Sequence, residues 1–217
     1  MLDTIRNDLI NDNIISLDLK FKELGDNVIT QILKLSERSS VLRSLDLTDN
    51  DIGTEGSVRL SEFLTKNTSL TELVLNLNPL SISKLSKGLS SNSTLRSLHL
   101  GFQNPTLADF NALFAAVSAS DSIHNLGLSD VGLSAESAYL LGRYIKSTTA
   151  LSELHLARNR LNDIALHHVV ASLRFNTTLV KLNLNRVYLD AVSITAIERF
   201  SQTSHNICRI YSSQNIR

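Results

Sequence analysis

Apolar residues recur along the chain in a six-residue pattern, with apolar side chains at the first, fourth and sixth positions of nearly every copy. Eight copies of this hexad begin at positions 14, 42, 70, 95, 123, 151, 179 and 207, so the spacing is 28 residues except for one spacing of 25. Each hexad is short, places its apolar residues on one side of an extended segment, and precedes turn formers such as Asn and Gly. The pattern predicts one short strand per repeat.

A helix is predicted in the second half of each repeat. In TEGSVRLSEFLTKNTS (54–69), the apolar residues Val58, Leu60, Phe63 and Leu64 have close to helical spacing. The position eighteen residues after the start of the hexad is apolar in every full-length repeat: Ile32, Leu60, Leu113, Leu141, Val169 and Ile197. A strand followed by a helix cannot bury its apolar faces alone, so the repeats must stack into a curved α/β solenoid with parallel strands inside and helices outside.

The turn between strand and helix has its own pattern. The ninth position of the repeat is asparagine in four copies, Asn50, Asn78, Asn159 and Asn215. A side-chain amide there can bond backbone groups on both sides of a turn. Two residues later comes an apolar residue that we expect to close the core from the turn: Leu24, Ile52, Leu80, Leu133, Leu161 and Leu189.

Repeats such as LRSLDLTDNDIGTEGSVRLSEFLTKNTS closely resemble, position by position, leucine-rich repeat proteins of the ribonuclease-inhibitor-like class. The resemblance covers residues 14–217 and rests on eight copies in register. It implies a leucine-rich repeat solenoid, or horseshoe, of about eight repeats, with the strands on the concave face and the helices on the convex face. Because this fold hosts inhibitors, GTPase regulators, innate sensors and bacterial effectors, the resemblance does not fix the function.

The ends and two central repeats depart from the pattern. Residues 1–13 are predicted to form an N-terminal capping helix, and residues 14–217 to form the repeat array. The repeat from Leu70 is three residues short, so we expect a shortened helix and a thin or irregular outer wall there. The next repeat has Gln103 in the asparagine position and Pro105 nearby, which we interpret as a local variant rather than a hinge. At the C-terminal end two explanations stay open: a longer protein was trimmed, or the last strand meets a partner.

The net charge and the cysteine content indicate which classes of partner and which cellular compartment to expect. Lys plus Arg and Asp plus Glu each number 21, so the net charge favours neither a nucleic-acid nor a membrane partner. The single cysteine, Cys208, excludes an internal disulfide and is typical of a reducing compartment. No apolar run approaches the ~18 residues of a bilayer-spanning helix, and the N-terminus does not resemble a Sec-type signal peptide. We therefore expect a cytoplasmic monomer, located in a host cytosol if it is a bacterial effector.

The histidines and Cys208 are the candidates for metal binding or catalysis. His99 and His155 hold the fifth hexad position two repeats apart, roughly 10 Å at ~4.8 Å per strand, which is too far to share one zinc ion directly. A metal site of His99, His124 and Glu153 is conceivable but lacks the ligand spacing of zinc motifs. His167 and His168 are predicted on a helix surface and His205 in a loop. No serine lies in a glycine-rich elbow and no phosphate loop is present, so we expect no catalytic site, metal or cofactor.

The remaining hypothesis is a binding surface formed by the outward hexad positions. Acidic residues come early, at Asp18, Asp46 and Glu72, and basic residues come late, at Arg158, Lys181, Arg186 and Arg209. Aromatic anchors are few, namely Phe21, Phe102, Tyr188 and Tyr211. The residues that we predict to contact a protein partner are Arg43, Asp46, Glu72, Arg96, His99, His124, Glu153, His155, Arg158, Lys181, Asn183, Arg209 and Tyr211.

These observations favour a non-enzymatic protein-interaction module that binds a protein partner through the concave face, as a signalling scaffold or a bacterial effector. Ribonuclease inhibition is not carried over, because related inhibitors present a strongly acidic, aromatic-rich face and many cysteines. Two alternatives stay open. One is a GTPase-regulating or other enzyme-modulating domain, with Arg158 or Arg186 as its critical arginine, and the other is the ligand-sensing fragment of a longer protein.

Overall fold

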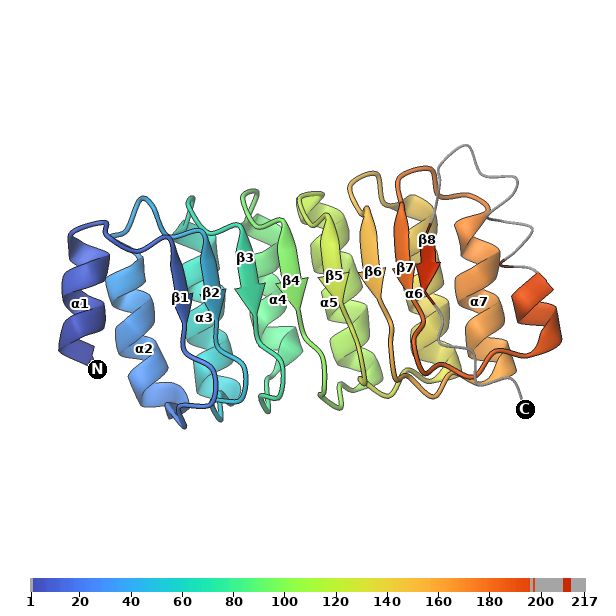
Figure 1. Ribbon diagram of the computed structural model, residues 1–217, viewed down its shortest axis with the longest axis horizontal. Helices are drawn as coiled ribbons and strands as arrows, with labels where there is room; N and C mark the ends of the chain where they lie inside the picture. Colours follow the sequence, from blue (N-terminus) through green and yellow to red (C-terminus); the bar gives the residue numbers. More distant parts are fainter. Residues whose placement is uncertain (1, 196, 198–208, 212–217) are drawn as a thin grey trace.

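The computed structural model describes residues 2–195, 197 and 209–211, which form one layer of parallel strands backed by one layer of helices (Figure 1). Within these residues, eight strands pair in chain order in one sheet. The strands are β1 (Ser16–Asp18), β2 (Ser44–Asp46), β3 (Glu72–Val74), β4 (Ser97–His99), β5 (Asn125–Gly127), β6 (Glu153–His155), β7 (Lys181–Asn183) and β8 (Arg209–Tyr211). The helices are α1 (Leu2–Ile10), α2 (Gly25–Ser36), α3 (Thr54–Lys66), α4 (Ile82–Ser91), α5 (Leu107–Ser120), α6 (Ala135–Ser147) and α7 (Asp163–Leu173).

The hexads determine both the strands and their register. Each strand pairs with the next position by position, as in Ser16 with Ser44 and Asp18 with Asp46. The middle residue of every strand from β1 to β7 is a leucine that is at most 5% exposed. Full burial of one such leucine stabilises the fold by about 1.5–3 kcal/mol. The predicted α/β horseshoe, with strands on the concave face, is confirmed.

The helices bury the positions that the repeat pattern singled out. Five of the predicted helical residues are fully buried: Ile32, Leu60, Leu113, Leu141 and Val169. The apolar residues predicted to close the turns are buried or pack against the core: Leu24, Ile52, Leu80, Leu133, Leu161 and Leu189. One continuous core therefore lies between the sheet and the helical layer.

The turn asparagines Asn50, Asn78 and Asn159 bond the preceding repeat, as predicted for their position. Asn159 Nδ2 donates to the carbonyl of Leu128 (2.7 Å), and its Oδ1 accepts from the backbone N–H of Val131 (3.0 Å). Gln103 performs part of this role, because its Nε2 donates to the carbonyl of Leu75 at 3.0 Å. Each such amide joins two consecutive repeats.

A second set of amides, at Asn67, Asn92 and Asn176, was not anticipated. We call them the cap asparagines, since each lies at or just beyond the end of a helix. Asn92 Nδ2 donates to the carbonyl of Leu64 on α3 (2.8 Å), and its Oδ1 accepts from the backbone N–H of Leu95 (2.7 Å). The signal was present in the sequence as Asn, two further residues that include Ser or Thr, and then the first leucine of the next hexad.

The helix of the short repeat is shortened, as expected. Helix α4 has 10 residues against 13 in α3 and 14 in α5. Gly88 lets α4 approach α3 so closely that its N–H donates to Ser61 Oγ at 2.8 Å, and an added Cβ would collide with the Ser61 backbone. Pro105 lies in the loop before α5, whose capping box is formed by Thr106 and Asp109. The short helix α4 is thus packed closely against α3 at Gly88.

The two ends are described to different extents. Helix α1 lies at the N-terminal end of the helical layer, with Ile5 and Leu9 buried. At the C-terminal end, His205, Cys208 and Asn215 lie outside the described residues. The boundaries of cap and array at residues 13 and 14 stay a prediction. No helix within the described ranges combines the length and the apolar character needed to cross a membrane.

Candidate functional site

The third and fifth hexad positions project from the concave side of the sheet as two rows of mostly polar side chains. The third-position row is Ser16, Ser44, Glu72, Ser97, Asn125, Glu153 and Lys181, and the fifth-position row is Asp18, Asp46, Val74, His99, Gly127, His155 and Asn183. Most of these residues are half-buried, because neighbouring side chains along each row shield one another. Seven of the thirteen predicted contact residues lie in these rows: Asp46, Glu72, His99, Glu153, His155, Lys181 and Asn183.

The other predicted contact residues lie elsewhere. Arg43, Arg96 and His124 precede their strands and bond the loops that lead into them. Arg43 Nη1 donates to the carbonyl of Ser40 (2.8 Å), Arg96 Nη1 donates to that of Ser93 (2.9 Å), and His124 Nδ1 contacts that of Ser122 (2.7 Å). These three side chains therefore lie where the loops enter β2, β4 and β5, beside the two rows.

Arg209 and Tyr211 belong to β8 by their backbone, but their side chains are outside the described part of the chain.

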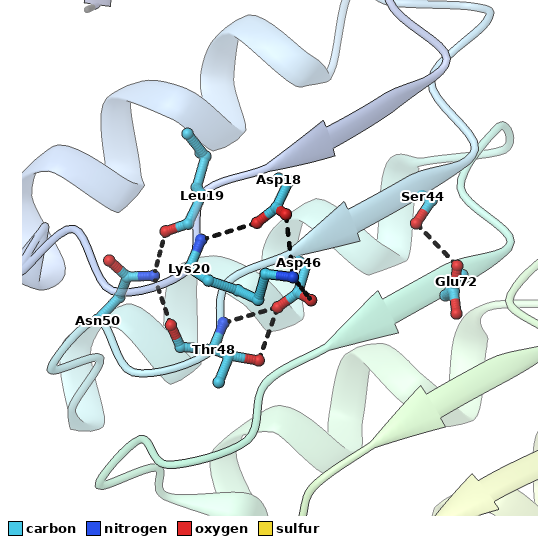
Figure 2. A network of polar contacts seen from close by, with 8 residues as sticks. All are labelled: Asp18, Leu19, Lys20, Ser44, Asp46, Thr48, Asn50 and Glu72. Carbon is cyan, nitrogen blue, oxygen red and sulfur yellow. Dashed lines mark hydrogen bonds and ion pairs between the residues drawn. The ribbon is translucent and has the colours of Figure 1, made fainter.

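Figure 2 shows the acidic end of the face, where Asp18 and Asp46 lie beside Lys20 and Glu72 lies beside Ser44. Lys20 Nζ is 3.0 Å from Asp18 Oδ2 and 3.7 Å from Asp46 Oδ2. The backbone N–H of Lys20, followed by its ammonium group, lowers the pKa of Asp18. Glu72 accepts a hydrogen bond from Ser44 Oγ at 2.8 Å, and no salt bridge to it occurs within the described residues. Glu72 is therefore the carboxylate whose charge is least compensated at this end.

At the centre of the face, His99 and His155 contact each other, although the sequence estimate placed them about 10 Å apart. Their ring centroids are 5.9 Å apart. The estimate was wrong because Gly127 lies between them without a side chain, and the His99 ring leans over it so closely that a Cβ on Gly127 would collide with His99 Nδ1. Burial lowers the pKa of both histidines, and for His155 the neighbouring His99 and Lys181 lower it further. Burial thus disfavours the protonated form of both rings.

Glu153 connects this histidine pair to β7. Its Oε2 accepts from Lys181 Nζ at 2.9 Å and lies 3.6 Å from His155 Nε2. Two side-chain atoms here, Asn125 Oδ1 and His155 Nε2, are buried and have no hydrogen-bond partner among the described residues. The centre of the face therefore combines a carboxylate that faces both Lys181 and His155 with a buried amide oxygen, that of Asn125, for which the described residues supply no hydrogen bond.

The loops at the end of the strands display a third row, which we call the edge row. It occupies the eighth repeat position and consists of Phe21, Asp49, Leu77, Phe102, Asp130, Arg158 and Arg186, all with φ between 54° and 63°. Phe21 and Phe102 are exposed, as is Tyr188 nearby. Arg158 Nε lies 3.3 Å from Asp130 Oδ2, and its guanidinium carbon lies 5.6 Å from the Phe102 ring centroid. The sequence did not reveal the left-handed backbone of this row, because no glycine marks it.

Comparison with known proteins identifies the fold. A family model described as "Leucine Rich repeat" matches residues 38–61. The chain is 32% identical over 182 residues to the "NACHT, LRR and PYD domains-containing protein 14" of Mus musculus, which covers 81% of this chain and 18% of that protein. The chain is a leucine-rich repeat protein of the ribonuclease-inhibitor-like class.

Two further matches agree with this assignment. "Protein CARMIL" of Dictyostelium discoideum is 26% identical over 176 residues, covering 75% of this chain and 17% of that protein. The crystal structure of the leucine-rich repeat-containing protein LegL7 from Legionella pneumophila superimposes with a TM-score of 0.62 at 21% identity, covering 87% of this chain and 62% of that one. This leucine-rich repeat chain spans about a fifth of the length of the curated relatives that it matches.

The convex side of the leucine-rich repeat array carries a groove between α5 and α6. Its volume is about 680 Å³, and Phe114, Leu140 and Arg143 contribute to its walls. A smaller hollow of about 400 Å³ adjoins it through Tyr139 and Leu140 and reaches His168. This groove is the main alternative location for a binding site on the helical side.

The residues that the structure describes also bear on metal binding. Within them, no group of three or more His, Cys, Asp or Glu side chains is arranged to hold a metal ion. His124, which the sequence placed near His99 and Glu153, contacts the carbonyl of Ser122 instead.

Proposed function

We propose that this leucine-rich repeat chain is a non-enzymatic protein-binding module and that its concave face is the contact surface. The observation that carries the proposal is the pair of in-register side-chain rows on a backbone that every neighbouring strand holds in place. A surface that is already ordered loses little conformational entropy on binding. Eight strands spaced ~4.8 Å apart span about 35 Å, enough for the ~800 Å² per partner of a standard interface.

The proposal includes the partner type, the oligomeric state and the compartment. The partner is a protein, and the module acts as a monomer in the cytoplasm. The contact surface consists of the central row residues together with Arg158 at its edge, flanked by Arg43, Arg96 and His124. Arg209 and Tyr211 extend it at β8.

A second candidate is the ligand-reading region of a longer protein. It is favoured by the 32% identity with a mouse protein whose name includes NACHT and PYD domains besides the leucine-rich repeats, and of which this chain spans 18%. No comparable observation favours a bacterial effector or a GTPase-regulating domain. Arg158, which the latter would use, is already held by Asp130 and Phe102.

The test exchanges charges without breaking the fold. The concave variant combines Glu153→Lys with Lys181→Glu, which keeps that ion pair in reversed order, and adds Glu72→Lys. The matched control exchanges Glu55 and Arg59 on α3, an ion pair of 2.8 Å on the helical side. Circular dichroism confirms that both variants are folded.

Native protein, concave variant and control are each used to capture partners from cell lysate, and the affinity of any partner is measured by calorimetry. We expect the control to keep the partner and the concave variant to bind it at least about tenfold more weakly, since each buried charge contact contributes about 1.5–3 kcal/mol. A partner bound equally by the concave variant contradicts the concave-face proposal, and mutation of Tyr139 in the convex groove is then the next test.

A further inference from the structure

The groove between α5 and α6 on the convex side has an aromatic floor. The rings of Phe114 on α5 and Tyr144 on α6 are stacked with their centroids 5.8 Å apart, and both side chains are buried although they line the groove. Tyr139 and Leu140 also line it, and Tyr139 is 51% exposed. Concave sites of this size with aromatic walls are where apolar groups of a ligand bind.

The groove follows the two helices for about three turns. Together with the adjoining hollow, its lining extends from Leu107 to Ser118 on α5 and from Ala135 to Ser147 on α6. At ~1.5 Å per residue, these stretches are about 16 Å and about 18 Å long. A third helix of about 12 residues therefore fits along the groove, with one row of its side chains directed into it.

The charges on the walls of the larger groove are all positive. Arg143 and Lys146 line it, and none of its lining residues is acidic. Within the part of the chain that the structure describes, neither of these two side chains forms an ion pair with a carboxylate. Lys146 Nζ lies 4.1 Å from the centroid of the Phe175 ring, a contact that leaves its charge in place. The larger groove is thus complementary to negatively charged side chains.

The acidic side chains on and next to these two helices contact other groups. Asp109 accepts from the backbone N–H of Ser83 at 2.9 Å, and Asp121, directly after α5, accepts from Thr149 Oγ1 at 2.9 Å. Glu136, in the first turn of α6, lines only the smaller hollow. A negatively charged group of a partner is therefore favoured in the larger groove and disfavoured at the N-terminal end of α6.

We propose that this groove binds an acidic amphipathic helix of a partner protein, with apolar side chains over Phe114 and Tyr144 and carboxylates at Arg143 and Lys146. This second surface lies on the helical side, so the inference does not depend on the proposed function of the concave face. Aromatic pockets supply much of the affinity of typical interfaces. The two basic residues select an acidic helix over a basic one, and the planar guanidinium of arginine matches the geometry of a carboxylate.

The probes are fluorescein-labelled helical peptides of about 14 residues, with leucine, phenylalanine or isoleucine three and four positions apart and glutamate on both sides of that apolar row. Each control peptide carries lysine in place of every glutamate. Binding to the full chain is measured by fluorescence anisotropy. We expect the best acidic peptide to bind at least about tenfold more tightly than its lysine counterpart.

A pair of charge variants tests the basic residues. Arg143→Glu combined with Lys146→Glu is expected to weaken binding of the acidic peptide at least about tenfold. Lys84→Glu combined with Lys87→Glu makes the same change in net charge at exposed positions of α4 and is expected to leave binding unchanged.

A pair of steric variants tests the groove itself. Ala115→Phe places a ring in the groove and is expected to weaken binding at least about tenfold, whereas Ala119→Phe, at an exposed position of α5 that does not line the groove, is expected to have no effect. Circular dichroism confirms that all variants are folded.

Equal binding of acidic and basic peptides, binding that survives in either groove variant, or no binding of any peptide would overturn the inference. The concave variant described above is expected to bind the acidic peptide as the native protein does. Since the two sets of variants lie on opposite sides of the molecule, a failure here is distinguishable from a failure of the proposed function.

Discussion

Replacement of Asn78 by alanine should remove a buried amide that joins the second repeat to the third. Asn78 Oδ1 accepts from the backbone N–H groups of Asn50 and Ile52, both at 3.0 Å. Its Nδ2 donates to the carbonyl of Leu47 at 2.9 Å. Alanine supplies none of these bonds. Asn50 and Ile52 are themselves fully buried, so water cannot reach their two unpaired backbone N–H groups unless the turn opens.

The magnitude follows from these two donors. A buried donor that loses its partner costs about 1–3 kcal/mol, so two of them destabilise the native state by about 2–6 kcal/mol. Gln103→Ala is the matched control, because Gln103 occupies the same position in the next repeat and donates a single bond of 3.0 Å to Leu75. One lost bond of this kind costs about 1 kcal/mol.

The assay must report locally, because stacked repeats can unfold in parts. Hydrogen exchange of the Asn50 and Ile52 amides measures the opening of this one turn, and urea unfolding measures the whole array. For Asn78→Ala we expect both amides to exchange at least about thirtyfold faster, the equivalent of about 2 kcal/mol. If the two amides stay as protected as in the native protein, or if Asn78→Ala costs no more than Gln103→Ala, the joining role of the turn asparagines is refuted.

Two further predictions concern packing and pH. Gly88→Ala pushes a methyl group into the backbone of α3 and should cost about 1–3 kcal/mol in thermal unfolding, whereas Ser90→Ala on the exposed face of α4 should leave the melting temperature nearly unchanged. A similar melting temperature for both variants would show that α4 is free to move outward. Burial lowers the folded-state pKa of His99 and His155 below the ordinary value of 6.5, so their contribution to stability is present above pH 6.5 and is lost as the pH falls toward the folded-state pKa. The urea midpoint should therefore decrease from pH 7.5 to pH 5.0, and decrease less in a His99→Gln, His155→Gln variant; equal decreases would assign the effect to other groups.

The strands and the core could be predicted because the leucine spacing specifies them directly. A hexad that returns every 28 residues leaves one register for parallel strands, and the observed pairing of Leu45 with Leu73 follows from it. The role of Asn159 was also predictable, since an amide at a fixed turn position has a fixed set of backbone neighbours. The helical layer was less predictable. The loss of three residues in one repeat was visible in the sequence, but the close approach of α4 to α3 at Gly88 depends on three-dimensional packing.

The candidate site could likewise be predicted only in part. The place of each row residue on the sheet could be predicted, because hexad position determines which face a side chain occupies. The distance between His99 and His155 could not be predicted, because a glycine at position 127 changes the direction of a neighbouring side chain rather than its own. Arg43 and Arg96 could be placed on the loops before β2 and β4 from the repeat pattern, but their bonds to the carbonyls of Ser40 and Ser93 could not.

The edge row carries exposed side chains on backbone positions that are held by hydrogen bonds to the next repeat. The backbone N–H of each of three bulky members, Phe21, Leu77 and Phe102, donates to a carbonyl of the next repeat at 2.8–3.1 Å, so neighbouring repeats impose its left-handed backbone. A side chain with a Cβ costs roughly 1–2 kcal/mol in this conformation, and asparagine tolerates it better.

Phe21 is 62% exposed and therefore regains little of that cost by burial. Phe21→Asn should accordingly raise the free energy of unfolding by about 0.5–1 kcal/mol in urea titration. A higher free energy of unfolding for Phe21→Asn would mean that the native chain keeps an aromatic group on its surface at the expense of stability, as expected for a residue that contacts a partner. A lower free energy of unfolding would mean that Phe21 packs against the array, and the edge row would then stabilise the fold rather than contact a partner.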